Sequence, residues 1–226
     1  MYVPAHFEPD DDEVRELLRN LGAADLVSAT AEGLLATMLP LLWVEPASGA
    51  DGWGVLHGHV ARNNRQWKVP AIGDAMAIVR GPDAYISPAW YATKREHGRV
   101  VPTWNYITAH VHGRLVIHDD PTWVEANVRA LSDRHEASRA VPWSVDDAPE
   151  PYIAGQLKAI VGVELVIDRV EGKWKLSQNR SDEDIAGTIE GLEATGEQEV
   201  SAAMRDLGRG AGTEARRGSD RLGGDP

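Results

Sequence analysis

The segment Thr103–His118 constrains the fold most strongly, because it reads as one long β-strand with two chemically different faces. Its even positions from 104 to 114 carry Trp, Tyr, Thr, His, His and Arg, whereas its odd positions from 107 to 115 carry Ile, Ala, Val, Gly and Leu. A period of two directs one face into a core and the other towards solvent, a ligand or a partner subunit. The segment therefore predicts a core strand that presents aromatic and imidazole side chains on its other side.

The rest of the chain predicts short strands and few long helices. We expect further strands at 26–30, 34–44, 53–60 and 75–80, and a hairpin of 161–170 and 173–178 that turns at Glu171-Gly172. Helices are expected at 10–20, 64–69, 121–136, 151–159 and 181–194. This pattern favours a mainly β barrel with flanking helices, an α+β fold, over a doubly wound parallel sheet.

Domain organisation follows from a change in composition near Thr195. Residues 1–194 contain every expected strand and are interpreted as one domain. Beyond Thr195, Gly, Arg, Ala, Ser and acidic residues alternate with few apolar ones, so residues 195–226 are expected to form a disordered tail.

Charge and composition narrow the classes of partner. The formal net charge is −12, the basic residues are scattered, and no helix–turn–helix pair is evident, so the charge does not support direct DNA binding. The chain has no cysteine, which excludes disulfides and thiolate metal sites. No apolar run has the length of a membrane span, and the N-terminus lacks a signal pattern. We therefore expect a cytoplasmic protein without membrane contact.

Two groups of side chains are candidates for ligand binding. The chain has eight Trp and one Phe. Large rings that carry a polar group are better suited to binding a planar anionic ligand than to forming a purely structural core. Tyr85, Ser87, Thr103, Trp104 and Tyr106 could line the site of such a ring. The alternative is that these aromatic residues belong to a core or to a dimer interface.

A second group lies after the expected strand at 53–60. His59, Arg62, Asn64 and Arg65 lead into the expected short helix at 64–69, and free N–H groups at a helix start beside guanidinium groups form an anion site. The alternative is that both arginines are solvated surface residues.

Two pairs of histidines raise the question of a metal site. His57 with His59, and His110 with His112, each share one strand face, and imidazole suits zinc and iron. No Asp or Glu occupies a recognisable ligand spacing, so ordinary polar strand positions are the favoured interpretation.

Five stretches of the sequence together resemble the PaiB family, whose members are described as FMN-binding negative transcriptional regulators. They are MYVPAHF from Met1, HGHVARNNRQW from His57, GPDAYISPAWY from Gly81, VPTWNY from Val101 running into HVHG at His110, and GKWKLSQNR from Gly172. The resemblance extends from residue 1 to about Leu192. It departs from the family at Asn64-Arg65, where Asn-Pro is common.

The resemblance implies a split β-barrel of FMN-binding type and a homodimer with cofactor sites between subunits. It implies an FMN phosphate near Arg62, with Asn64 nearby, and an isoalloxazine ring near Trp104, and it adds Lys175 and Gln178 through the family's Lys-Leu-Ser-Gln word. Haem-dependent piperazate synthases are similar in the same sequence stretches and imply an alternative. In that alternative His59 ligates haem iron and the protein catalyses N–N bond formation. A flavin-dependent oxidoreductase is a further alternative. We rank FMN binding first and haem second, and direct DNA contact rests on the family description alone.

Overall fold

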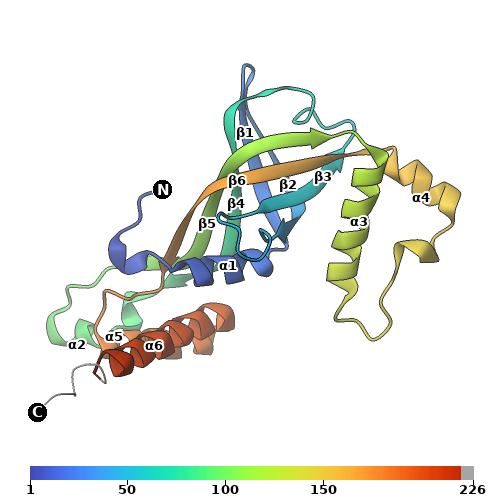
Figure 1. Cartoon of the computed structure of the whole chain (residues 1–226). Coiled ribbons are helices and arrows are strands. Elements are labelled where there is room, and N and C mark those ends of the chain that lie inside the picture. The colour runs from blue at the N-terminus through green and yellow to red at the C-terminus, as the bar shows by residue number, and fades with distance from the viewer. Residues whose placement is uncertain (220–226) are drawn as a thin grey trace, which may run out of the picture. The chain divides into compact units, whose positions relative to one another are not determined.

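The computed structural model of this protein describes the backbone of residues 1–219 and the side chains of residues 1–208. Its strands form a sheet in the order β1-β2-β3-β6-β5-β4, which closes into a barrel because β4 pairs back onto β1 (Figure 1). The strands are β1 Ala23–Thr30, β2 Gly33–Val44, β3 Val55–Ala61, β4 Ala71–Ile86, β5 Thr103–His118 and β6 Ile160–Lys175. The predicted fold class, a mainly β split barrel with flanking helices, is confirmed.

The α-helices are α1 Asp11–Arg19, α2 Thr93–His97, α3 Pro121–Glu136, α4 Glu150–Leu157, α5 Asp182–Thr195 and α6 Gln198–Ser219. Short 3₁₀ turns lie at η1 Ala5–Phe7, η2 Pro88–Trp90 and η3 Val145–Asp147. Helix starts follow local chemistry. Asp10 and Glu13 form a reciprocal capping box on α1, and Asp120 caps α3, which begins with Pro121. No helix of the described residues is long and apolar enough to cross a membrane.

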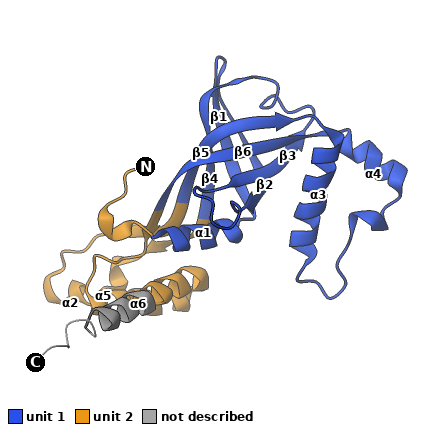
Figure 2. Ribbon diagram, viewed as in Figure 1, with its two compact units in different colours: residues 1, 10–80, 109–172 blue, residues 2–9, 81–108, 173–226 orange. Residues whose placement is uncertain are grey.

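The chain divides into two compact units, coloured separately in Figure 2. Unit 1 comprises residues 1, 10–80 and 109–172. Unit 2 comprises residues 2–9, 81–108 and 173–226, of which 220–226 lie outside the described residues. Strands β4, β5 and β6 each contribute residues to both units.

Close packing within unit 1 depends on glycines where elements meet. A Cβ on Gly162 would lie 2.3 Å from Cζ3 of Trp123, so glycine lets α3 pack against β6. A Cβ on Gly113 would lie 2.0 Å from the carbonyl oxygen of Val166, so glycine also lets β5 approach β6. The core beneath consists of apolar side chains from alternate strand positions and from α1, among them Leu18, Leu26, Leu41, Leu56, Val60, Val79, Val111 and Val161.

Unit 2 includes a packed helix where the sequence predicted a disordered tail. Helix α6 begins at Gln198, and its Val200 and Met204 are only 1% and 4% exposed. The two side chains lie four residues apart and therefore on one face of the helix. The structure gives residues 198–219 as helix α6, whereas the composition of 195–226 predicts a disordered tail. Val200 and Met204 supply apolar contacts that the polar average composition does not indicate. The expectation for 220–226 concerns residues outside the described part of the chain.

Two local predictions fail. Residues 64–69 form turns rather than a helix. Asn64 Oδ1 accepts a hydrogen bond from the Gln66 backbone N–H at 2.8 Å in an Asx-turn, and one further turn, in which the Val69 N–H donates to the Arg65 carbonyl, ends at Pro70. The expected hairpin turn at Glu171-Gly172 does not exist, because β6 continues through it to Lys175.

Candidate functional site

The predicted site residues fall into the two units, and each group is described separately. His59, Arg62 and Asn64 belong to unit 1. The others belong to unit 2, namely Tyr85, Ser87, Thr103, Trp104, Tyr106, Lys175 and Gln178.

Arg62 follows β3, and its guanidinium group is fully engaged within unit 1. Two nitrogens bond to the carboxylate of Asp119, at 2.6 and 3.1 Å. Nε donates to the carbonyl oxygen of Lys158 at 2.7 Å, and Nη2 also donates to that of Ile160 at 3.1 Å. The hydrogen bond to Arg62 lowers the pKa of Asp119, so the pair is ionised and mutually neutralised. Arg62 therefore joins the ends of β3, β5 and β6 instead of offering an unpaired cation.

Arg62 also lines a cavity of about 480 Å³. Its wall is largely apolar and comes from the start of α3, the end of α4 and the first residue of β6, including Pro121, Val124, Ala154, Leu157 and Ile160. The volume is within the range of small-molecule sites. Its polar lining consists of the neutralised Arg62–Asp119 pair together with Lys158 and Glu125, so positive and negative side chains balance and give little net attraction for an anion.

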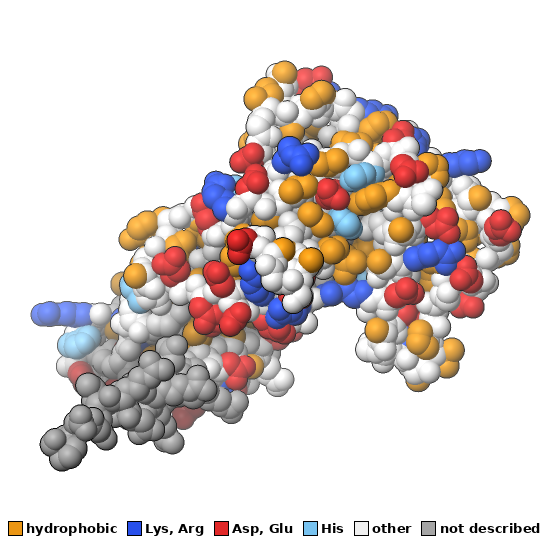
Figure 3. Space-filling view, in the orientation of Figure 1, with side chains coloured by type: hydrophobic (Ala, Val, Ile, Leu, Met, Phe, Trp, Pro, Cys, Tyr) orange, Lys and Arg blue, Asp and Glu red, His pale blue; other side chains and the backbone are white. Residues whose placement is uncertain are grey.

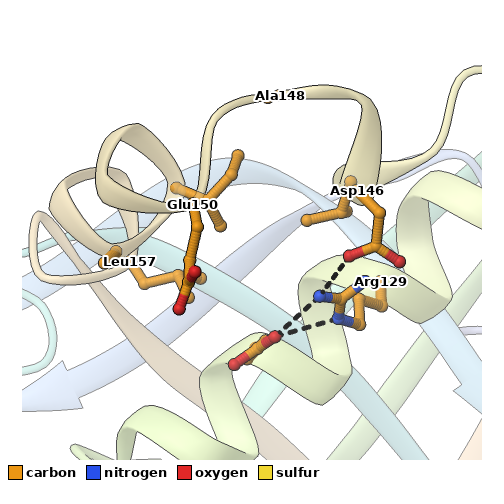
Figure 4. A pocket seen from close by; sticks show the side chains of 9 residues that line it. Arg129, Asp146, Ala148, Glu150 and Leu157 are labelled. Atoms are coloured by element: carbon orange, nitrogen blue, oxygen red, sulfur yellow. Dashed lines mark hydrogen bonds and ion pairs between the residues drawn. The ribbon is translucent and has the colours of Figure 1, made fainter.

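A second cavity, of about 440 Å³, lies between α3, η3 and α4 (Figure 4). Arg129 is its cation, and a dashed line in the figure joins it to Asp146. Its Nε and Nη2 also donate to Oε1 of Glu125, at 3.0 and 2.8 Å. Glu150 adds a further carboxylate to the lining. The acidic residues outnumber the arginine, so this cavity does not favour a phosphate.

His59 lies on the outward face of β3 and contacts α3. Its Nδ1 is 3.4 Å from the amide nitrogen of Asn127, a buried residue of that helix. Burial lowers the pKa of His59, which favours the neutral ring. The neighbouring His57 bonds to Glu164 at 3.0 Å and meets the ring of Trp123 edge-on. These histidines are thus half-buried where α3 contacts the barrel.

Asn64 and Arg65 have partners on or beside β2 within unit 1. Besides forming the Asx-turn, Asn64 donates to Oγ1 of Thr37 at 3.0 Å. Arg65 forms an ion pair with Glu32. Since 64–69 is not a helix, the predicted helix N-terminus that would have completed an anion site is absent from this segment.

Unit 2 brings several predicted residues into direct contact around Lys175. The Lys175 Nζ donates to Oγ1 of Thr103 at 2.6 Å and to the carbonyl oxygen of Trp104. It also lies 6.0 Å from the ring centre of Tyr106. Thr103, Trp104 and Tyr106 come from the first residues of β5, and Lys175 is the last residue of β6.

The charge around Lys175 is uncompensated. Burial, followed by the charges of Lys173 and Arg180, lowers the pKa of Lys175. None of these three side chains has a carboxylate within salt-bridge distance among the described residues. They lie over aromatic rings instead: Lys173 over Tyr2 and Tyr106, and Arg180 over Tyr91. In a chain of net charge −12, these three cations create a local positive potential that attracts an anion.

Two aromatic rings in this unit are exposed to solvent. Tyr85 is 49% exposed and Trp104 is 53% exposed. Their ring centres are 6.2 Å apart in an edge-on arrangement. An aromatic pair that is ordered yet exposed offers its faces to a planar partner. We call Lys173, Lys175, Arg180, Tyr85 and Trp104 the cationic–aromatic cluster.

Ser87 and Gln178 have structural roles in this arrangement. Ser87 Oγ caps η2 by accepting from the Ala89 N–H at 3.2 Å. The Gln178 side chain accepts from Leu176 N–H at 2.7 Å and donates to the Trp174 carbonyl at 2.5 Å. It thereby closes the turn at Ser177, which adopts a positive φ of 69°.

Lys173 and Arg180 were not among the predicted site residues. The signal for Lys173 was available, because Lys173 and Lys175 are two apart and share a strand face. Arg180 follows β6 after the turn at Ser177, in which its backbone N–H donates to the Ser177 carbonyl, and this turn returns its charge towards Lys175.

Comparison with known sequences connects the chain to a family. Residues 1–169 match the family described as "Putative FMN-binding domain". The protease synthase and sporulation protein PAI 2 of Bacillus subtilis is 30% identical over 195 residues, covering 85% of this chain and 89% of that protein. The uncharacterized protein AN0679 of Emericella nidulans is 31% identical over 230 residues, covering 87% of this chain and 92% of its own length.

Solved structures agree on the fold. The FAD and haem binding protein from Mycobacterium smegmatis has a TM-score of 0.52 at 16% identity, covering 78% of this chain and 77% of that one. The flavocytochrome Anf3 from Azotobacter vinelandii has a TM-score of 0.51 at 16% identity, covering 82% and 78%. At these identities the likeness concerns the fold alone. The sequence match and the barrel together show that the chain belongs to the family of FMN-binding split-barrel domains.

Proposed function

We propose that this protein binds FMN at the cationic–aromatic cluster of unit 2, with the phosphate at Lys175 and the isoalloxazine ring against Trp104 and Tyr85. The observation that carries the proposal is the charge of Lys175, which has no carboxylate partner among the described residues and donates to Thr103 and to the Trp104 carbonyl. The ring of the same Trp104 is exposed and pairs with the exposed ring of Tyr85. Family membership supports a flavin as the ligand.

The chemistry of the cluster fits both ends of FMN. Burial, and after it repulsion by Lys173 and Arg180, lowers the pKa of Lys175. A phosphate dianion would offset that repulsion and would form charge-assisted hydrogen bonds with the ammonium group. The isoalloxazine is planar and largely apolar, and it would cover ring surface that Tyr85 and Trp104 otherwise expose to water. The Thr103 hydroxyl, already bonded to Lys175 Nζ, orients the ammonium group.

Bound FMN would supply reversible electron or hydride transfer. The protein's own contribution is binding and orientation. Lys175 fixes the position of the phosphate, and the rings of Trp104 and Tyr85 fix the plane of the flavin and exclude water from its covered face.

We further propose that the protein is a homodimer. On the outward face of the barrel in unit 1, Leu34 and Met38 of β2 and Ile72 of β4 are mainly exposed. Leu34 and Met38 alternate along β2 with less exposed positions, so they form an apolar strip on one face of the strand. Burial against a second copy would remove this apolar surface from water. Sedimentation as a monomer at micromolar concentration would contradict this assembly.

Haem remains the second candidate, and His59 carries it. Burial keeps the imidazole neutral, as an iron ligand must be. Its ring, however, already contacts Asn127 beneath α3. FMN is preferred because unit 2 offers both an uncompensated charge and exposed rings.

We propose that regulation, which the resemblance to the PaiB family implies, acts through the flavin rather than through direct DNA contact. The net charge is −12, and on the face shown in Figure 3 the basic side chains are scattered among acidic ones. A DNA-binding surface needs a gathered basic patch.

The test is a fluorescence titration of the wild type, Lys175→Met and Lys94→Met with FMN and, separately, with riboflavin, which lacks the phosphate. Lys94 is an exposed lysine of α2 in the same unit, so its substitution removes the same charge without touching the cluster. Removing a charge-assisted hydrogen bond costs roughly 1.5–3 kcal/mol, so Lys175→Met should weaken FMN binding about 10- to 100-fold.

Riboflavin gives the sharper comparison. Its affinity should change far less in Lys175→Met, because the ammonium group that this substitution removes binds the phosphate, which riboflavin does not have. Equal losses of affinity for both ligands would place Lys175 at the ring instead. Unchanged FMN affinity in Lys175→Met, or an equal loss in Lys94→Met, would contradict the proposed site.

A further inference from the structure

Unit 1 contains a cluster of two imidazoles and a carboxylate outside the proposed flavin site. His110 and His112 occupy alternate positions on β5, and Glu171 lies on the neighbouring strand β6. One ligand atom from each of the three side chains lies within 4.8 Å of the other two. Because β6 continues through Glu171-Gly172 without a turn, Glu171 stays on the strand next to β5.

The spacing is close to that of a metal site. Bonds of about 2.0–2.2 Å to one ion place its ligand atoms roughly 3.0–3.5 Å apart. His112 Nε2 and Glu171 Oε2 are 3.7 Å apart, so small rotations of the side chains would bring the donor atoms to bonding distance.

His112 is incompletely satisfied by the protein. Its Nε2 is buried and has no hydrogen-bond partner among the described residues. A buried polar atom without a partner is costly, and a bound ion would satisfy it. Burial also lowers the pKa of His110 and of His112, so both rings are neutral near pH 7 and have a lone pair to donate.

Glu171 supplies the negative charge of the cluster. Its pKa is lowered, chiefly by a hydrogen bond with the N-terminal amino group of Met1, so the carboxylate is ionised. Arg169 lies 3.9 Å from its other oxygen. An ion must compete with the Met1 contact for Oε2, while Arg169 can continue to hold Oε1.

We propose that His110, His112 and Glu171 bind a divalent transition-metal ion such as Zn²⁺ or Fe²⁺. Two imidazoles and one carboxylate form a donor set that suits these ions and not Mg²⁺ or Ca²⁺, which prefer oxygen ligands alone. Three protein ligands leave at least one coordination position for water or a small ligand. The site involves none of the residues of the proposed flavin site.

The experiment uses the full-length chain after removal of metal by a chelator. Zn²⁺ is titrated by calorimetry, and Co²⁺ serves as a second probe because its visible absorption reports coordination. The wild type should bind one ion per chain. His112→Ala and Glu171→Gln should each weaken binding by at least about tenfold, since removing a direct ligand should cost no less than removing a supporting residue. His135→Ala, which removes an exposed histidine of α3 in the same unit, should bind as the wild type does.

Thermal unfolding of the wild type and of Glu171→Gln provides a second test that does not depend on the folding of His112→Ala. Zn²⁺ should raise the melting temperature of the wild type by linkage and should raise that of Glu171→Gln, a nearly isosteric change, much less. Absence of saturable Zn²⁺ binding by the wild type would overturn the proposal. Wild-type affinity in Glu171→Gln, or an equal loss in His135→Ala, would do the same.

Discussion

The packing of helix α6 leads to a prediction that opposes the expectation from composition. Val200 and Met204 are almost fully buried in unit 2, and the Met204 sulfur lies 3.5 Å from the side-chain nitrogen of the buried Asn105. The perturbation is the double substitution Val200→Ala/Met204→Ala, which keeps helix propensity high and removes only the packed side chains.

The magnitude follows from burial. Truncating a buried Met to Ala costs about 2–5 kcal/mol, and the two carbons removed from Val200 add about 1.6 kcal/mol at roughly 0.8 kcal/mol each. The two residues are neighbours on one helix face, so their effects need not add. We therefore expect a loss of at least about 3 kcal/mol, a large part of the roughly 5–15 kcal/mol that stabilises a typical domain.

The assay is urea unfolding followed by circular dichroism and by tryptophan fluorescence. Arg205→Ala is the matched control, because Arg205 also lies on α6 and its substitution removes a partly exposed ion pair with Glu193 of α5. That control should cost less than about 1 kcal/mol. A double variant whose stability falls by no more than the control's would refute the packing of α6 and restore the interpretation of the segment as a tail.

Three further results are expected. Arg62→Ala should lower stability but change FMN affinity by less than about threefold, because the guanidinium group is bound to Asp119. A 10- to 100-fold loss of affinity would show instead that Arg62 binds the phosphate. Burial lowers the pKa of His59, so its stabilisation is present above the ordinary histidine pKa of about 6.5 and is lost as the pH falls through the folded-state value. The free energy of unfolding of His59→Gln, measured by denaturation, should therefore fall less on acidification than that of the wild type. An equal fall would contradict a lowered pKa of His59. Any DNA binding, measured by fluorescence anisotropy, should be weak and should disappear as salt is raised, whereas tight sequence-specific binding at physiological salt would contradict the charge argument.

The sequence predicts best where the signal is local and periodic. The alternation of Thr103–His118 predicts β5 with its bounds, and Asp120-Pro121 predicts the start of α3. Both depend on side-chain period and capping, which neighbouring residues determine.

It predicts less well where distant residues decide the outcome. Glu171-Gly172 is typical of a turn, yet pairing within the barrel keeps β6 extended. Arg62 resembles a free anion ligand until Asp119, 57 residues away in sequence, neutralises it. Tertiary context overrides the local signal at each of these positions.

Direct titration of the purified wild-type chain with FMN tests the central claim most directly, with haemin titrated in parallel. We predict saturable FMN binding at one molecule per chain, with quenched flavin fluorescence as the ring packs against Trp104 and Tyr85. We also predict no sharp Soret band at one equivalent of haemin. Failure to bind FMN would contradict the proposed flavin site. Stoichiometric haemin binding that His59→Ala abolishes would contradict it too and would identify a haem protein.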